Sequence, residues 1–152
     1  MKGHFVRSIR VLIGESVDNL LCAQSGHIVA HSKSAGKLYL FWLNGQLITS
    51  VRTRTSIESL VVNGTSNTLV CGLATGTVEM RELSSLTPLL EYNLKVHGSI
   101  TCLWTSEDQQ FLMAGSADGT FSVLTNPEER LALLQSAISK SPILLGGLGG
   151  LG

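Results

Sequence analysis

The stretch that decides the fold is FLMAGSADGTFSVLT, which runs from Phe111 to Thr125. An apolar run leads into the corner Gly115–Gly119, and a second apolar run with alternating polarity follows it. This pattern is typical of a β-hairpin, because strands have a side-chain period of two and tight turns favour Gly and Asp. If the hairpin recurs along the chain, the fold is a repeat architecture, which usually builds binding surfaces.

The hairpin recurs 43 residues earlier in the chain. Residues 57–83 align with residues 100–126 without a gap, and seven of the aligned positions are identical. The shared amino acids include both glycines of each hairpin, so the two segments are expected to form the same structure. The identical pairs around the corner are Gly72 with Gly115, Ala74 with Ala117, Gly76 with Gly119, and Thr77 with Thr120.

A weaker third copy precedes these two. Residues 27–45, HIVAHSKSAGKLYLFWLNG, follow the same plan, and Gly36 lies 40 residues before Gly76. A further β-rich run follows the hairpin, QLITSVR (46–52) in the first copy and PLLEYNL (88–94) in the second. A period of about 40–45 residues with four strands is typical of a propeller blade. The sequence therefore predicts an all-β fold, a partial β-propeller of about three four-stranded blades.

Six residues are expected to shape the corners of the hairpins. Glycine adopts positive φ at little steric cost, and an aspartate can accept hydrogen bonds from the backbone N–H groups of its own turn. The predicted corner residues are Gly36, Gly72, Gly76, Gly115, Asp118 and Gly119.

Composition argues against several classes of protein. Lys plus Arg and Asp plus Glu number 11 each, so the formal net charge is zero, whereas nucleic-acid-binding domains usually carry a basic excess. The three cysteines form no C-x-x-C pair, which favours reduced thiols and a cytoplasmic protein over a disulfide framework. No stretch approaches the roughly 20 apolar residues of a membrane helix, and Val11–Ile13 is too short for a signal-peptide core.

No residue pattern indicates catalysis, a cofactor or a metal. His27 and His31 lie on a predicted strand, where four residues span about 13 Å, too far for one ion. The thiols have no neighbouring base, and the turn explains Asp118 fully. Trp42 and Trp104 are expected in the packing between blades. We therefore expect no catalytic, cofactor-binding or metal-ligating residues.

The hairpin MAGSADGTFSVL resembles the middle of a WD repeat, in which a Ser/Gly-Asp-Gly-Thr corner joins the second and third strands. The Trp-Asp pair that names the repeat is absent, and MREL and SVLT stand in its place. The usual Gly-His pair is also missing, because His97-Gly98 has the reverse order.

A longer pattern covers residues 5 to 126, and its elements are Arg7–Ile9, Gly26–Val29, Leu38–Gly45, Gly72–Leu86 and Gly115–Gly119. In the order of these elements the chain is similar to the carboxy-terminal WD-repeat region of BEACH-domain proteins, the neurobeachin group. The resemblance implies a non-catalytic protein–protein interaction scaffold in vesicle trafficking or membrane-associated cargo sorting. It also implies a cytoplasmic location, with peripheral attachment to endomembranes only through partners. The implied partners are other proteins, together with upstream BEACH and propeller segments of the same or a parent polypeptide.

Two alternative functions stay open at this point. One is a stand-alone WD-repeat adaptor. The other is a propeller-based enzyme with a carboxylate or histidine cluster in its central channel, although only scattered polar residues are visible. A BEACH domain encoded directly upstream would favour the scaffold.

The chain is expected to divide into a partial propeller, residues 1–126, and a tail, residues 127–152. The tail begins as a short helix with Asn126 as its N-cap and Pro127 in its first turn, and ends in a Leu/Gly-rich stretch. Three blades make only part of a ring, so apolar faces and strand edges would be exposed. The purified chain is therefore expected to self-associate.

Overall fold

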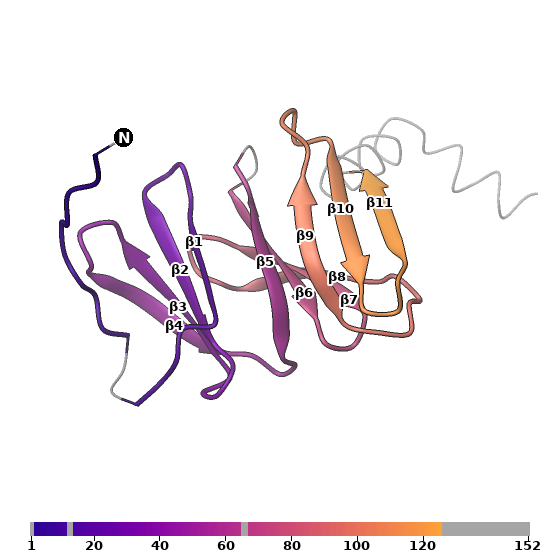
Figure 1. Ribbon diagram of the computed structural model, residues 1–152, viewed down its shortest axis with the longest axis horizontal. Helices are drawn as coiled ribbons and strands as arrows, with labels where there is room; N and C mark the ends of the chain where they lie inside the picture. The colour runs from indigo at the N-terminus through magenta and orange to yellow at the C-terminus, as the bar shows by residue number, and fades with distance from the viewer. Residues whose placement is uncertain (1, 12–13, 65–66, 126–152) are drawn as a thin grey trace, which may run out of the picture.

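The computed structural model describes residues 2–11, 14–64 and 67–125, and these residues form eleven β-strands and no helix. The strands make three antiparallel sheets that follow one another along the chain (Figure 1). The prediction of an all-β partial propeller is confirmed. The predicted helix after Asn126 lies outside the described residues.

Each sheet is one blade, in which consecutive strands are neighbours. Blade 1 contains β1 (Asn19–Cys22), β2 (His27–Ser32), β3 (Lys37–Trp42) and β4 (Leu47–Arg52). Blade 2 contains β5 (Ile57–Asn63), β6 (Thr68–Leu73), β7 (Thr77–Glu82) and β8 (Pro88–Asn93). Blade 3 contains β9 (Ile100–Thr105), β10 (Phe111–Ser116) and β11 (Phe121–Thr125).

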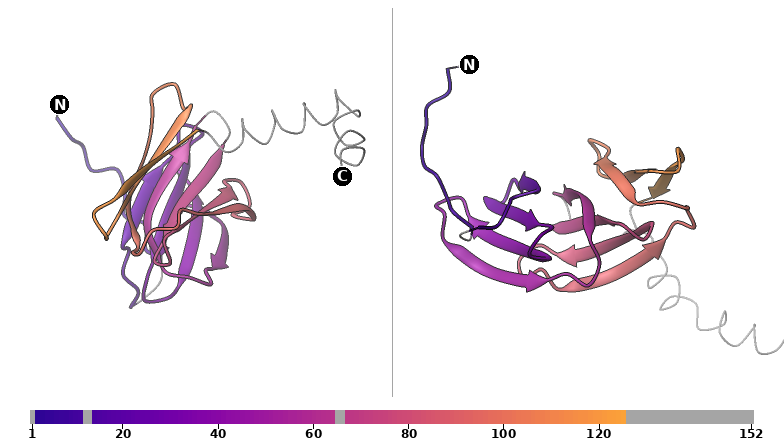
Figure 2. Two further views of the ribbon diagram at one scale, coloured as in Figure 1. Left: turned by 90° about the vertical axis from the view of Figure 1, so that its right-hand side faces the viewer. Right: turned by 60° about the horizontal axis from the view of Figure 1, so that its bottom comes forward.

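The blades stack face to face along a curve, as Figure 2 shows in its right-hand view. The first strands of the blades, β1, β5 and β9, are neighbours across the stack (Figure 1). This arrangement is that of the inner strands of a propeller, which line its central axis.

Apolar side chains on both faces of blade 2 hold the stack together. Alternate residues of a strand point to opposite faces, so Leu69 and Cys71 of β6 face blade 1 and Val70 faces blade 3. This double burial explains why β6 is a continuous buried run, whereas the outer strands β4 and β8 alternate. The cluster between blades 1 and 2 includes Val29, Leu38, Leu40, Ile57, Leu83 and Leu86, and that between blades 2 and 3 includes Val78, Met80, Ile100, Leu112 and Ala114.

Gly72 and Gly115 correct the sequence-based prediction, because they lie inside β6 and β10 and not at hairpin corners. A Cβ atom at Gly72 would lie 2.6 Å from Cγ2 of Ile100 and would also collide with Oγ of Ser59. A Cβ atom at Gly115 would lie 2.5 Å from Sγ of Cys102. These glycines are therefore needed for close approach between neighbouring strands and blades, a role that a strand glycine can serve without a turn.

The chain before β1 covers the outer face of blade 1. Residues 2–11 contain no strand and run along the side of blade 1 that faces away from blade 2 (Figure 1, indigo). Val11 packs against the buried Ala30, Tyr39 and Phe41, and the Tyr39 hydroxyl donates a 2.6 Å hydrogen bond to Glu15 Oε2. A segment that is not itself a blade thus packs against part of the apolar face at this end of the stack.

Candidate functional site

Three of the predicted corner glycines lie in the turns between the second and third strands of their blades. Their φ values are 59° at Gly36, 81° at Gly76 and 88° at Gly119, all in the left-handed region. Glycine reaches this region without the steric penalty of a Cβ atom. These residues set the shape of three equivalent turns along one rim of the stack.

Asp118 holds the third turn to the connection that precedes blade 3. Its Oδ1 accepts hydrogen bonds from the hydroxyl and the backbone N–H of Thr120 at 2.6 and 2.9 Å, and its Oδ2 accepts one from the backbone N–H of His97 at 2.9 Å. The Thr120 hydroxyl, followed by the backbone N–H groups of His97 and Thr120, lowers the pKa of this carboxyl. Through these hydrogen bonds Asp118 stabilises the turn and its contact with the connection before blade 3, which is a structural role.

Substitution of the turn glycines is expected to destabilise the chain in a graded way. Gly119→Val should cost about 1–2 kcal/mol, because it forces a β-branched residue into the left-handed region although the surrounding space is open. Gly76→Val should cost more, because its Cβ would also lie 2.9 Å from the backbone oxygen of Gly98. Thermal unfolding followed by circular dichroism measures the loss of stability in both variants. An unchanged melting temperature for Gly119→Val, or a smaller effect at Gly76, would contradict the assignment.

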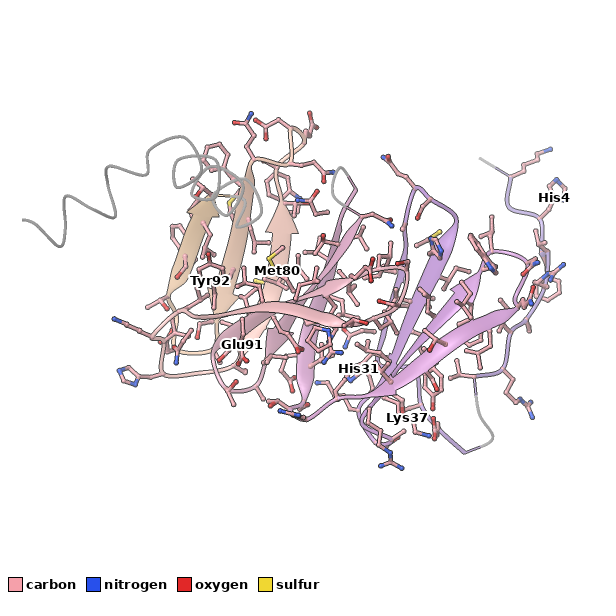
Figure 3. The ribbon with its side chains drawn as sticks, turned by 180° about the vertical axis from the view of Figure 1, so that it is seen from behind. His4, His31, Lys37, Met80, Glu91 and Tyr92 are labelled. Atoms are coloured by element: carbon pink, nitrogen blue, oxygen red, sulfur yellow. The ribbon has the colours of Figure 1, made fainter. Side chains whose placement is uncertain are left out.

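A cleft of about 570 Å³ separates the outer strands of blades 1 and 2. Its blade 1 side carries Arg52 and Arg54, both exposed. Its blade 2 side carries Glu91 of β8, labelled in Figure 3, and the hydroxyls of Ser85 and Thr87. The cleft thus offers two exposed guanidinium groups beside the partly exposed apolar side chains of Val51 and Pro88. Its remaining lining residues are Thr55, Leu73, Glu79, Arg81 and Leu86.

Arg81 forms part of the cleft wall but is only 5% exposed. Its Nε and Nη2 donate hydrogen bonds of 3.1 and 2.9 Å to the two carboxylate oxygens of Glu79, and its Nη1 donates one of 2.8 Å to the carbonyl of Leu86. Such a bidentate pair fixes the orientation of the guanidinium. Arg81 therefore shapes the cleft, whereas Arg52 and Arg54 are the arginines that face solvent there.

Comparison with known proteins decides the family. The family model described as the neurobeachin beta propeller domain matches residues 1–132. The chain belongs to the neurobeachin beta propeller family. BEACH domain-containing protein B of Arabidopsis thaliana is similar to it, with 28% identity over 131 residues. That match covers 85% of this chain and 5% of the relative, so the chain spans a small part of that protein's length.

Solved structures share the fold of this neurobeachin-type propeller. Sqt1 of Saccharomyces cerevisiae superposes with a TM-score of 0.65 at 16% identity, over 76% of this chain and 34% of that one. The computationally designed protein Ika4 gives 0.58 at 22% identity, over 72% of this chain and 65% of its own. The designed protein Ika8 gives 0.59 at 21% identity, over 72% and 33%. Similarity at these identities concerns the fold alone.

The two histidines of β2 have separate surroundings in the neurobeachin-type blade 1. The His27 ring stacks on Trp42 with ring centroids 4.3 Å apart, and its Nδ1 lies 2.8 Å from the Ser25 hydroxyl. The His31 ring is buried, with Nδ1 3.3 Å from Nδ2 of Asn19 and no hydrogen-bond partner at Nε2. Within residues 2–11, 14–64 and 67–125, no group of three or more His, Cys, Asp or Glu side chains could hold a metal ion.

Acidification is expected to destabilise the chain through His31. Burial is the largest influence on the His31 pKa and lowers it; Lys33 also lowers it, while Asp18 and Glu58 act in the opposite direction. The unfolded chain therefore binds the proton more readily than the folded chain. The stabilising contribution is complete above the unfolded value of about 6.5 and is lost as the pH falls from there through the lower folded value.

Urea denaturation of variants at about pH 7.5 and about pH 5.5 tests this effect, since that interval contains the unfolded pKa. His31→Gln keeps a polar side chain beside Asn19 but does not titrate, so it should lose less stability on acidification than the unmodified chain. His97→Gln, at an exposed histidine that meets Asp118 only through its backbone, should behave like the unmodified chain. Equal losses in all three proteins would exclude His31 as the cause.

The three cysteines differ in exposure, and the buried one lacks the surroundings of a nucleophile. Cys71 is buried between blades 1 and 2, and burial raises the pKa of its thiol. Cys22 and Cys102 are exposed thiols. Nucleophilic cysteines need a lowered pKa, so Cys71 is the least suited of the three.

Sequence reasoning missed the cleft and its two exposed arginines. The alternation R-x-R in Arg52-Thr53-Arg54, which begins at the last residue of the predicted strand QLITSVR, was the available signal. It places both guanidinium groups on one side of an extended chain, because residues two apart share a face. The neighbouring blade 2 residues that complete the cleft lie 19 or more positions away and could not be assigned to it without the packing of the blades.

Proposed function

We propose that this propeller region is a non-catalytic protein–protein interaction scaffold acting in vesicle trafficking or membrane-associated cargo sorting. The match of the neurobeachin beta propeller family over residues 1–132 carries the proposal. The similarity to a BEACH domain-containing protein supports it further. The expected location is the cytoplasm, at endomembranes through partner proteins. No helix in the described ranges is long and apolar enough to cross a membrane.

The cleft between blades 1 and 2 is the proposed docking place for a partner. Arg52 and Arg54 are exposed and lie on the same side of an extended segment. Guanidinium groups bind carboxylates through paired, charge-assisted hydrogen bonds. Val51 and Pro88, the apolar lining residues with accessible surface, can contact an aliphatic side chain. The partner segment is therefore expected to carry acidic residues next to an apolar one.

Cargo transport in cells tests both parts of the proposal. Disrupting the gene should slow delivery of a fluorescent membrane cargo, and expression of the unmodified protein should restore the rate. The double variant Arg52→Glu with Arg54→Glu should fail to restore it, because both charges are reversed at the cleft. Lys95→Glu reverses a single charge at an exposed site outside the cleft and should restore transport.

The possible outcomes distinguish a role in trafficking from docking of a partner in the cleft between blades 1 and 2. Unchanged cargo delivery after gene disruption would contradict a role in trafficking. Full restoration by the double variant would contradict docking in the cleft while leaving the role intact. Loss of folding in the double variant is checked by its melting temperature, which should match that of Lys95→Glu because the substituted side chains are exposed.

A further inference from the structure

The face of blade 3 that points away from blade 2 is an ordered apolar surface. Residues directly opposite each other in an antiparallel pair share a face. Met113 lies opposite both Trp104 and Val123, and Gly115 lies opposite both Cys102 and Phe121. Trp104 is 52% exposed, Val123 55% and Phe121 78%. We call this array, Cys102, Trp104, Met113, Gly115, Phe121 and Val123, the open face.

The internal repeat shows that this face is built to be covered. Shifted by 43 residues, Gly115, Phe121 and Val123 correspond to Gly72, Val78 and Met80 of blade 2. On blade 2 these residues lie under blade 3, and Val78 and Met80 are almost fully buried. Because Gly72 has no Cβ atom, the Ile100 side chain of blade 3 packs directly against its backbone. Gly115 leaves the same opening on the open face.

The other end of the stack shows how this chain covers such a face. There, Val11, Glu15 and Tyr39 join the segment before β1 to blade 1, although that segment is not a blade. Ile9 also reaches Gly45, where a Cβ atom would lie 3.1 Å from Cγ1 of Ile9. An extended piece of this chain thus packs against part of one apolar blade face.

We propose that the segment Leu131–Leu145 of this same chain docks on the open face of blade 3. The segment follows β11, which borders that face, by only six residues. Six extended residues span about 20 Å, whereas the three strands of blade 3 are together about 10 Å wide. The segment therefore reaches every residue of the open face without strain.

The chemistry of the segment suits an apolar sheet face. Leu131, Leu134 and Ile138 recur at the spacing of one helix face, in the stretch for which the sequence predicts a helix. Lys140 is the one charged residue between Leu131 and Leu145. A short connection also gives the segment an effective concentration in the millimolar range. The segment should therefore keep a second copy of the chain from binding to the open face, in contrast to the self-association expected from the sequence.

Thiol-labelling rates of the full chain test the docking, because Cys102 lies on the open face and Cys22 lies on β1 of blade 1. Cys102 should react at least tenfold more slowly than Cys22. The double variant Leu134→Asp with Ile138→Asp should bring the two rates together without changing that of Cys22. The matched control, Gln135→Asp with Ser136→Asp, adds the same charge to the same segment and should leave Cys102 protected.

A crosslink gives a second readout that does not depend on protection. In a Cys22→Ser chain, Leu134→Cys should form an intramolecular disulfide with Cys102 on mild oxidation, seen as a monomer with a shifted mobility. Equal labelling of Cys102 and Cys22 in the unmodified chain would overturn the proposal. So would protection that disappears on dilution, which would identify a second copy as the occupant, or protection that survives in the Leu134→Asp and Ile138→Asp chain.

Discussion

Gly72→Ala is expected to lower the free energy of unfolding by about 3 kcal/mol, at the upper end for overpacking a core. The new methyl group would lie 2.6 Å from Cγ2 of Ile100, in the contact between blades 2 and 3. Real Cβ atoms do not tolerate such a distance, so the blades must separate or the strand must shift. Both changes would expose part of the cluster that contains Val70 and Met80.

Chemical denaturation with matched variants checks this result. Gly64→Ala introduces the same methyl group at a turn, where its nearest neighbour is the flexible Gln109 side chain at 3.4 Å, and should change stability by less than about 0.5 kcal/mol. Adding Ile100→Ala to Gly72→Ala should recover part of the loss, because it removes the closest obstructing carbon at this contact. A Gly72→Ala chain as stable as the unmodified one would show that blades 2 and 3 are not in close contact.

Arg81→Met is expected to destabilise the chain by about 3–5 kcal/mol, the cost of removing one partner from a buried ion pair. The substitution leaves the Glu79 carboxylate and the Leu86 carbonyl without the guanidinium that binds both. The side chains of Arg81 and Glu79 are only 6% and 15% exposed, so water replaces the lost bonds poorly.

A double substitution tests whether the loss of stability in Arg81→Met comes from the buried Glu79 charge that is left without its partner. Glu79→Leu with Arg81→Trp places an indole where a WD repeat carries its tryptophan, and should restore most of the stability because no buried charge is left alone. Arg54→Met, at an exposed arginine of the same cleft, should change stability by less than about 0.5 kcal/mol. Urea denaturation gives all three values. A loss below about 1 kcal/mol for Arg81→Met would mean that the Arg81–Glu79 pair is not buried as described.

The hairpins were predictable from the sequence because their determinants are local. The hairpin predicted in Phe111–Thr125 is formed by β10 and β11, on either side of the predicted corner. The fourth strands QLITSVR and PLLEYNL were found in the same way, as β4 and β8. Each depends on a side-chain period and on turn residues a few positions away.

The contacts between blades could not be predicted, because they join residues far apart in the chain. Gly72 looked like a corner glycine until Ile100 was placed above it. Arg81 lies in MREL, the segment that stands in place of the Trp-Asp pair, and nothing in the sequence indicated that Glu79 and Leu86 would bind its guanidinium. His31 lies opposite Leu38, two residues after Gly36, as Gly72 lies opposite Val78, two residues after Gly76. An imidazole therefore occupies in blade 1 the place that blade 2 leaves open. Such differences follow from packing, to which the repeat pattern is insensitive.

The order in which the strands pair has a consequence during synthesis. Every strand of blade 2 pairs with its neighbour in the chain, so this sheet can form as soon as Asn93 has left the ribosome. Its apolar face stays uncovered until Leu112 and Ala114 of β10 arrive about 20 residues later. At about 5–20 residues per second, the nascent chain exposes that face for about 1–4 s. Chaperones that recognise apolar nascent segments would have this interval in which to bind.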